Sequence, residues 1–173
     1  MKRLFFLLLL GASGALRAQS FPQSFTGNWS GQLHWYPAGA PEPKVVDMQL
    51  RVHPVADSPG RYSWQIIYGK EGKDNRPYVL QPVDPAKGHW MIDERNGILL
   101  DGYWLGGRFS GAFSVGPSVI TDTYYLQGDS LIVEFYATGK TPVRTSGLGT
   151  EASPTVESFG LRSFQRAVLR RKE

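Results

Sequence analysis

Short runs of alternating apolar and polar residues, broken by glycine, proline and Asn/Asp pairs, constrain this fold more than any other feature. In residues 25–36 every second position is aromatic, aliphatic or glycine, and the positions between them are mostly polar. Residues 46–53 and 61–68 repeat the pattern. Because successive side chains of a strand point to opposite faces, period two predicts strands with one buried face. The chain holds about ten such runs, which favours a closed sheet. We expect an all-β fold: a single antiparallel up-and-down β-barrel of about 8–10 strands.

Tight turns test this interpretation, because a two-residue turn fixes which residues face each other across a hairpin. A turn at Gly106-Gly107 places Trp104 opposite Phe109, so two apolar residues share a face. The same turn sets Gly102 against Gly111, which predicts a stretch of wall without side chains, where the sheet could bend sharply or a ligand could approach the backbone.

A second two-residue turn, at Gly128-Asp129, pairs Leu126 with Leu131 and Tyr124 with Val133. Here too the turn and the alternation agree on which side chains point inward.

The same test fails at Asn96-Gly97. A two-residue turn there puts Trp90 and Ile92 on the face of Asp101 and not on that of Leu100. Either this loop is longer or the strand before it is buried on both sides, and the sequence leaves both open.

The C-terminal part of the chain is less regular. Residues 139–158 lack both periodicity and large apolar side chains, so we expect a long irregular loop. Residues 161–169 regain apolar character and are compatible with a strand or a short helix.

The first 18 residues have the order of a secretory signal peptide. Lys2 and Arg3 precede a run of seven apolar residues, and small residues follow, with a cleavage point after Ala18 or, less favoured, Ala15. The run is shorter than the roughly 20 residues that span a bilayer, so we expect no transmembrane anchor after processing. This predicts a secreted or periplasmic protein with one domain, residues 19–173.

Charge and cysteine content exclude several classes of function. Of 19 Lys and Arg residues three lie in the signal peptide, which leaves 16 against 15 Asp and Glu. A mature chain so close to neutral offers no basic face for nucleic acid. Because the chain has no cysteine, disulfides, thiolate zinc sites and cysteine nucleophiles are also excluded. We expect no metal site, since His34, His53 and His89 have no metal-binding spacing.

A family resemblance supports the barrel. Phe25-Thr26-Gly27-Asn28-Trp29-Ser30-Gly31 resembles the Gly-x-Trp first strand of the calycin superfamily, which includes lipocalins and fatty-acid-binding proteins. Residues 120–125 are similar to the Thr-Asp-x-x-Tyr element of lipocalins. The resemblance implies a lipocalin-like barrel in which Trp29 plugs the closed end and an arginine near the C-terminus, Arg166 or Arg170, packs over it. The chain departs from that pattern in having no disulfide, no clear late helix and more strands.

The inward-facing aromatic residues are the candidate ligand site. They either fill the barrel or line a cavity for one flat or aliphatic molecule. The alternation places the following side chains inside: Trp35, Trp64, Tyr68, Trp104, Phe109, Phe113 and Tyr124.

Asp122 is an acidic residue that the hairpin register places on an inward face. A buried carboxylate needs a partner or takes up a proton. It either orients the polar end of a ligand or makes a structural bond to a nearby arginine, tyrosine or backbone amide, unless a register slip leaves it exposed. The structural bond is the favoured role, and Asp122 joins the inward aromatics among the predicted ligand-binding residues.

These features predict an exported lipocalin-like protein that binds a small hydrophobic molecule of unknown identity inside the barrel. One alternative is a barrel enzyme that acts on a similar ligand, for which two or more converging titratable groups would be needed. Another is a cell-envelope interaction protein with a filled barrel, whose function lies on its surface. Binding is favoured over catalysis, and no catalytic residue or cofactor is assigned.

Overall fold

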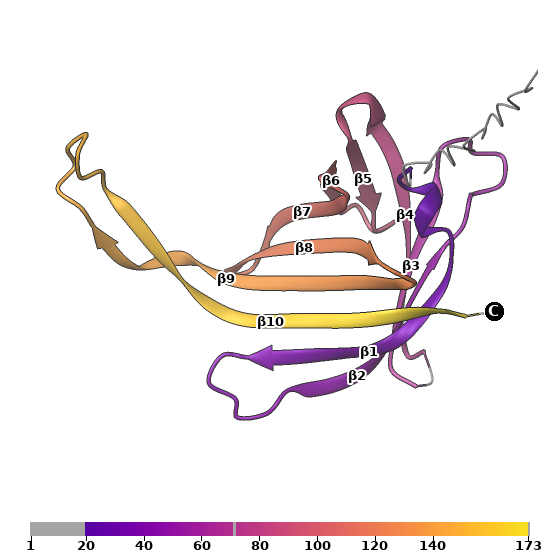
Figure 1. Ribbon diagram of the computed structural model, residues 1–173, viewed down its shortest axis with the longest axis horizontal. Helices are drawn as coiled ribbons and strands as arrows, with labels where there is room; N and C mark the ends of the chain where they lie inside the picture. Colours follow the sequence, from indigo (N-terminus) through magenta and orange to yellow (C-terminus); the bar gives the residue numbers. More distant parts are fainter. Residues whose placement is uncertain (1–19, 71, 173) are drawn as a thin grey trace, which may run out of the picture.

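The computed structural model describes residues 20–70 and 72–172, which form one closed barrel of antiparallel strands (Figure 1). The strands follow one another around the barrel in chain order, and the tenth closes it against the first. The predicted signal peptide and its cleavage point lie outside the described residues. The bounds are β1 Gly27–Pro37, β2 Lys44–Val52, β3 Tyr62–Tyr68, β4 Asp74–Asp84, β5 His89–Asp93, β6 Leu99–Leu105, β7 Arg108–Val115, β8 Ser118–Gln127, β9 Ser130–Ser146 and β10 Val156–Lys172.

The all-β, up-and-down prediction is confirmed, with ten strands among the described residues. Two short 3-10 helices, η1 Gln23–Phe25 and η2 Pro85–Lys87, are the helical elements in this part of the chain. No helix of the described residues is long and apolar enough to cross a membrane. Residues 161–169, compatible with a strand or a helix by sequence, belong to β10.

The registers predicted from the two tight turns are confirmed. Trp104 faces Phe109 across β6 and β7, and Tyr124 faces Val133 across β8 and β9. The Asn96-Gly97 ambiguity is resolved in favour of a longer loop. Trp90 pairs with Gly102, because residues 94–98 form the loop between β5 and β6. A hydrogen bond of 3.0 Å from the Glu94 N–H to the Ile98 carbonyl closes this loop.

Gly102 does face Gly111, but the expected gap in the wall is wrong. A Cβ at Gly102 would lie 2.5 Å from the Phe109 ring, and one at Gly111 would lie 2.8 Å from the carboxylate of Asp122. The space that the two glycines leave is therefore filled by neighbouring side chains. Glycine here permits close packing and leaves no room for a ligand.

The expected irregular loop at 139–158 is also wrong, because β9 continues to Ser146 and β10 begins at Val156. The last pairing of β9 with β8 is at Gly139, and β1 accompanies β10 only from Ser163. Residues 140–161, here called the arm, therefore form a two-stranded ribbon that extends well beyond the barrel (Figure 1). A ribbon with solvent on both faces needs no apolar alternation, so a test for one buried face cannot detect it.

Trp29 lies at the closed end of the barrel and is 3% exposed. Its Nε1–H donates to the Phe25 carbonyl at 2.8 Å. The arginine over its ring is Arg171, at 4.3 Å from the ring centroid, and that guanidinium also donates to the Thr26 carbonyl. The arrangement implied by the resemblance is present, but its arginine is neither of the two predicted.

The two predicted arginines bind carboxylates elsewhere. Arg166 lies on the outer face and donates to Glu134 at 3.2 Å, and Arg170 pairs with Asp129. Strand alternation explains the difference: Arg171 faces Trp29 directly across β1 and β10, whereas Arg166 and Arg170 have the opposite parity and point outward.

Candidate functional site

The closed half of the barrel interior is densely filled with aromatic rings. Trp64, Phe109 and Tyr124 are at most 2% exposed, and Trp64 packs edge-on against Tyr124 with ring centroids 5.0 Å apart. Phe21, from the segment before β1, stacks on Phe109 at 4.7 Å and on Trp104 at 4.8 Å. This half is a packed core without room for a ligand.

The mouth half of the barrel holds a cavity of about 430 Å³. Trp35, Tyr68, Phe113 and Phe135 line it with rings, and smaller apolar residues complete the wall. The size and the largely apolar lining are those of small-molecule sites. The smaller apolar residues are Leu33, Val46, Ile120 and Ala137.

The predicted site residues fall into two groups. Trp35, Tyr68 and Phe113 line the cavity. The others lie deeper: Trp64, Trp104 and Tyr124 belong to or pack against the closed-half core, and Asp122 lies between the two layers.

Three polar side chains face the cavity, and sequence reasoning missed all of them: Asp74, Arg76 and Gln165. Arg76 donates from Nε to Asp74 Oδ1 at 2.9 Å and from Nη2 to Oδ2 at 2.8 Å. The guanidinium also lies over the Tyr68 ring, 4.9 Å from its centroid. Counting back in steps of two from buried Leu80 would have placed Arg76 and Asp74 on the inner face.

The ion pair sets the protonation of its two members. Its hydrogen bonds from Arg76 hold the pKa of Asp74 below its usual value, and Asp74 holds the pKa of Arg76 above its own. Burial raises the pKa of Tyr68 to about 12, so its hydroxyl remains protonated. The cavity thus carries a fixed guanidinium with N–H donors, at Nη1 and Nη2, that Asp74 does not use.

Asp122 is 7% exposed and faces Phe135 and Gly111. The Gly111 N–H donates to its Oδ1 at 3.0 Å, which is the structural bond to a backbone amide that the sequence analysis favoured. Burial raises the pKa of this carboxyl to about 6, although backbone N–H groups, including that of Gly111, oppose the rise.

Phe21 and Phe25 are the second omission of the sequence analysis. The alternation predicts that Phe25 belongs to the first strand, but this residue ends η1 and is fully buried beside Trp64, with ring centroids 6.2 Å apart. Phe21 lies in the turn that leads into η1, and its ring meets that of Phe25 edge-on with centroids 5.2 Å apart.

Two of the three histidines make local polar contacts. His53 lies 2.9 Å from the side-chain oxygen of Asn28, and His89 lies 2.6 Å from a carboxylate oxygen of Asp101. Within residues 20–70 and 72–172, no group of three or more His, Asp or Glu side chains is placed to hold a metal ion.

Comparison with known proteins supports the fold alone. No family model and no curated protein matches the chain. The barrel is similar to the crystal structure of a protein of unknown function from the DUF3598 family of Nostoc punctiforme, with a TM-score of 0.60 and 12% sequence identity. The match covers 87% of this chain and 48% of the other, so this chain spans about half the length of that neighbour.

Proposed function

We propose that this is an exported protein that binds one small, mostly apolar molecule in the mouth cavity. The cavity itself carries the proposal: a barrel whose closed half is completely filled keeps about 430 Å³ open at the other end. Ala137 of β9 and Gln165 of β10 belong to the lining of this open layer. An aromatic wall of this kind gains free energy when an apolar molecule replaces water in it.

Arg76 gives the ligand its orientation. Its guanidinium faces the cavity from β4, and Asp74 fixes it through two hydrogen bonds. A hydrogen-bond acceptor on the ligand, such as a carboxylate or carbonyl, meets the remaining N–H donors, while the apolar body lies against Trp35 and Phe113. The preferred ligand is therefore amphipathic.

Binding is favoured over catalysis by the state of the titratable groups. Asp74 and Arg76 satisfy each other, and the lowered pKa of Asp74 makes it a poor proton acceptor near neutral pH. Asp122, the carboxyl with a raised pKa, lies below the cavity lining and already binds Gly111. These groups do not converge on a common point where a substrate atom could react.

The experiment begins with protein recovered from the periplasm or medium of its own host, so that recovery also tests export. Organic extraction and mass spectrometry should yield an amphipathic molecule. Recombinant protein should bind dodecanoate, used as a probe, with saturable calorimetric heat. Arg76→Gln should weaken dodecanoate binding about tenfold and leave dodecanol binding unchanged, because only the carboxylate loses a charge-assisted hydrogen bond.

Filling the cavity is the complementary test. Ala137→Phe places a ring in the cavity and should abolish binding of both probes. Ala112→Phe is the matched control, because Ala112 is exposed on the outer face of β7, and it should bind like the parent. Equal binding by a folded Ala137→Phe variant would place the site elsewhere. No saturable binding by the folded parent, and no extracted molecule, would refute the proposal.

A further inference from the structure

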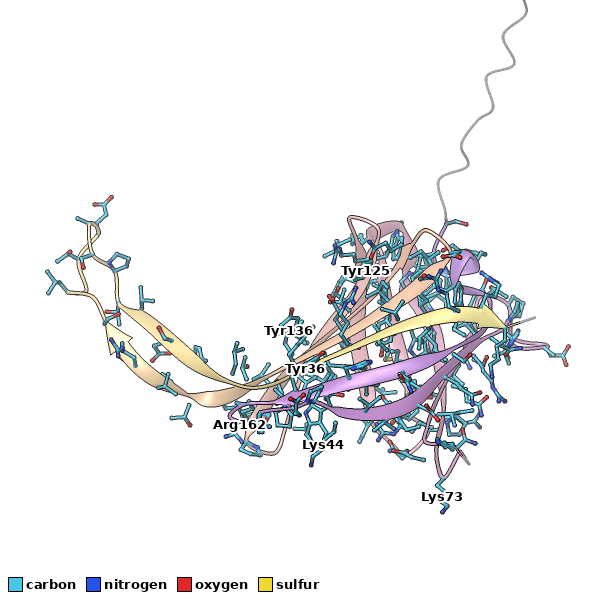
Figure 2. All side chains as sticks on the ribbon, turned by 60° about the horizontal axis from the view of Figure 1, so that its bottom comes forward. Tyr36, Lys44, Lys73, Tyr125, Tyr136 and Arg162 are labelled. Atoms are coloured by element: carbon cyan, nitrogen blue, oxygen red, sulfur yellow. The ribbon has the colours of Figure 1, made fainter. Side chains whose placement is uncertain are left out.

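The outer face near the root of the arm carries an aromatic row that the cavity does not use, in which Tyr36 and Tyr136 are exposed and Phe164 is half-buried. Tyr36, Phe164 and Tyr136 stand side by side on β1, β10 and β9, with centroid separations of 6.0 Å and 4.7 Å. Figure 2 shows Tyr36 and Tyr136 at this root, where the arm leaves the barrel. Exposed apolar surface of this kind marks a contact site in a soluble protein.

Apolar residues continue from this row in both directions along β10. On the arm side lie Leu161, which faces Thr138 of β9, and Phe159, which faces Pro142. On the barrel side, Val168 borders a hollow of about 740 Å³ between the outer faces of β1 and β10. One molecule therefore presents a projecting apolar ribbon and a hollow on the same strand.

We propose that the occupant of this face is a second copy of the chain, and that the arm of each copy lies across β1 and β10 of the other. A two-fold axis through Phe164 reverses the direction of β10, so a residue n positions before Phe164 lies over one n positions after it in the partner copy. Leu161 and Phe159 then cover the hollow beside Val168. Each copy offers the same two surfaces, so the contact closes on itself.

Charge complementarity supports this partner. The axis brings Glu157, seven positions before Phe164, to the end of β10 in the partner copy, beside Arg170 on its outer face. The tip of the arm carries Glu151, which overhangs the same basic end of β10. The two glutamates of the arm therefore meet the Arg170 end of β10 twice in the dimer.

The available area is sufficient. β10 has 17 residues, and at roughly 3.3 Å each this gives a strip about 55 Å long. Two to three strands at about 4.8 Å spacing make it about 10–15 Å wide, or roughly 550–800 Å² per copy. A standard interface buries about 800 Å² per partner, so the whole strip is needed and shortening the arm should be decisive.

Light scattering after size-exclusion chromatography should give twice the mass of the chain at micromolar concentration. The double variant Phe159→Asp/Leu161→Asp should be monomeric, with Kd raised by roughly 100-fold or more, because two charges would be buried in the contact. Leu105→Asp is the matched control: Leu105 and Leu161 are both 64% exposed, but Leu105 lies at the β6–β7 turn, away from the arm. This control should stay dimeric.

Two further variants keep the test decisive. Ala137 pairs with Ser163 across β9 and β10, so an Asn-Gly turn can join these two residues and remove residues 138–162, which include the arm; this chain should fold and be monomeric. Glu157→Lys should raise Kd by about 3–10-fold, an effect that salt removes. A parent chain that is monomeric at all concentrations overturns the proposal, as does a dimer that survives removal of the arm.

Discussion

The two halves of the barrel interior receive aromatic side chains from many of the same strands, yet only the closed half is filled. β1, β3 and β7 contribute rings to both halves: Trp29, Tyr62, Trp64 and Phe109 to the closed half, and Trp35, Tyr68 and Phe113 to the mouth half. The difference comes from the segment before β1, which inserts Phe21 and Phe25 into the closed half. No described segment does the same at the mouth. Whether a barrel of this composition is solid or hollow thus depends on residues outside its strands.

Two tryptophans give the strongest test of this contrast. Trp64 is fully buried, whereas Trp35 is 36% exposed and lines the cavity. Trp64→Ala should lower the free energy of unfolding by about 3–5 kcal/mol, because the rigid surroundings leave a cavity where the indole was. Trp35→Ala should cost less than about 1 kcal/mol, since it enlarges a space that is already open. Denaturant melts of both variants measure the difference.

Equal losses for the two variants would contradict the contrast. A large cost at Trp35 would mean that the mouth is packed in solution, and binding would then require the cavity to open. A small cost at Trp64 would mean that the closed half is not a rigid core.

Asp122 lies at the boundary between the halves and gives a pH-dependent test. Burial raises its pKa from 3.8 to about 6 in the folded chain. The folded state therefore keeps a proton that the unfolded state loses, so the free energy of unfolding falls as pH rises from about 4 to about 6. The penalty reaches about 3 kcal/mol and is fully present above pH 6.

Asp122→Asn removes this charge and leaves an oxygen that can accept the Gly111 N–H. The variant should match the parent near pH 4 and be more stable by up to about 3 kcal/mol at pH 7.5. Comparing the two proteins at each pH cancels the contribution of the other carboxylates. A constant difference across this range would mean that Asp122 is exposed to water through the cavity.

Alternation and turn geometry were enough to predict the barrel and most of the inward side chains. They succeed where one face is buried, because a one-residue slip would move every side chain to the other face. They fail for the arm, where residues 140–161 have solvent on both faces and backbone pairing alone decides the structure. The Arg171 contact was missed because a family pattern gives the residue type but not its parity on β10.

The cavity could not be predicted from the same rules. Period two shows that Trp35 and Trp64 both point inward, but volume depends on which side chains meet in each layer. That requires the position of Phe21, whose segment has no strand pattern. The position of Arg76 could be predicted from the sequence, because it shares a face of β4 with Leu80. Charged residues are rarely buried, however, so the alternation rule is normally not applied to them.

The smallest expected effect compares the two ends through their cation–π contacts. Arg171 covers Trp29 at the closed end at 4.3 Å, and Lys44 lies over Trp35 at the mouth at 5.0 Å. Arg171→Gln should cost about 0.5–1 kcal/mol, because it loses this contact and a hydrogen bond to the Thr26 carbonyl above a buried ring. Lys44→Gln should change stability by less than about 0.5 kcal/mol, since the Trp35 ring under Lys44 is already partly hydrated. Thermal melts of both variants, made in the arm-shortened chain so that the proposed dimer does not contribute, separate the two values. A larger loss at Lys44 would mean that the mouth is held closed by its rim.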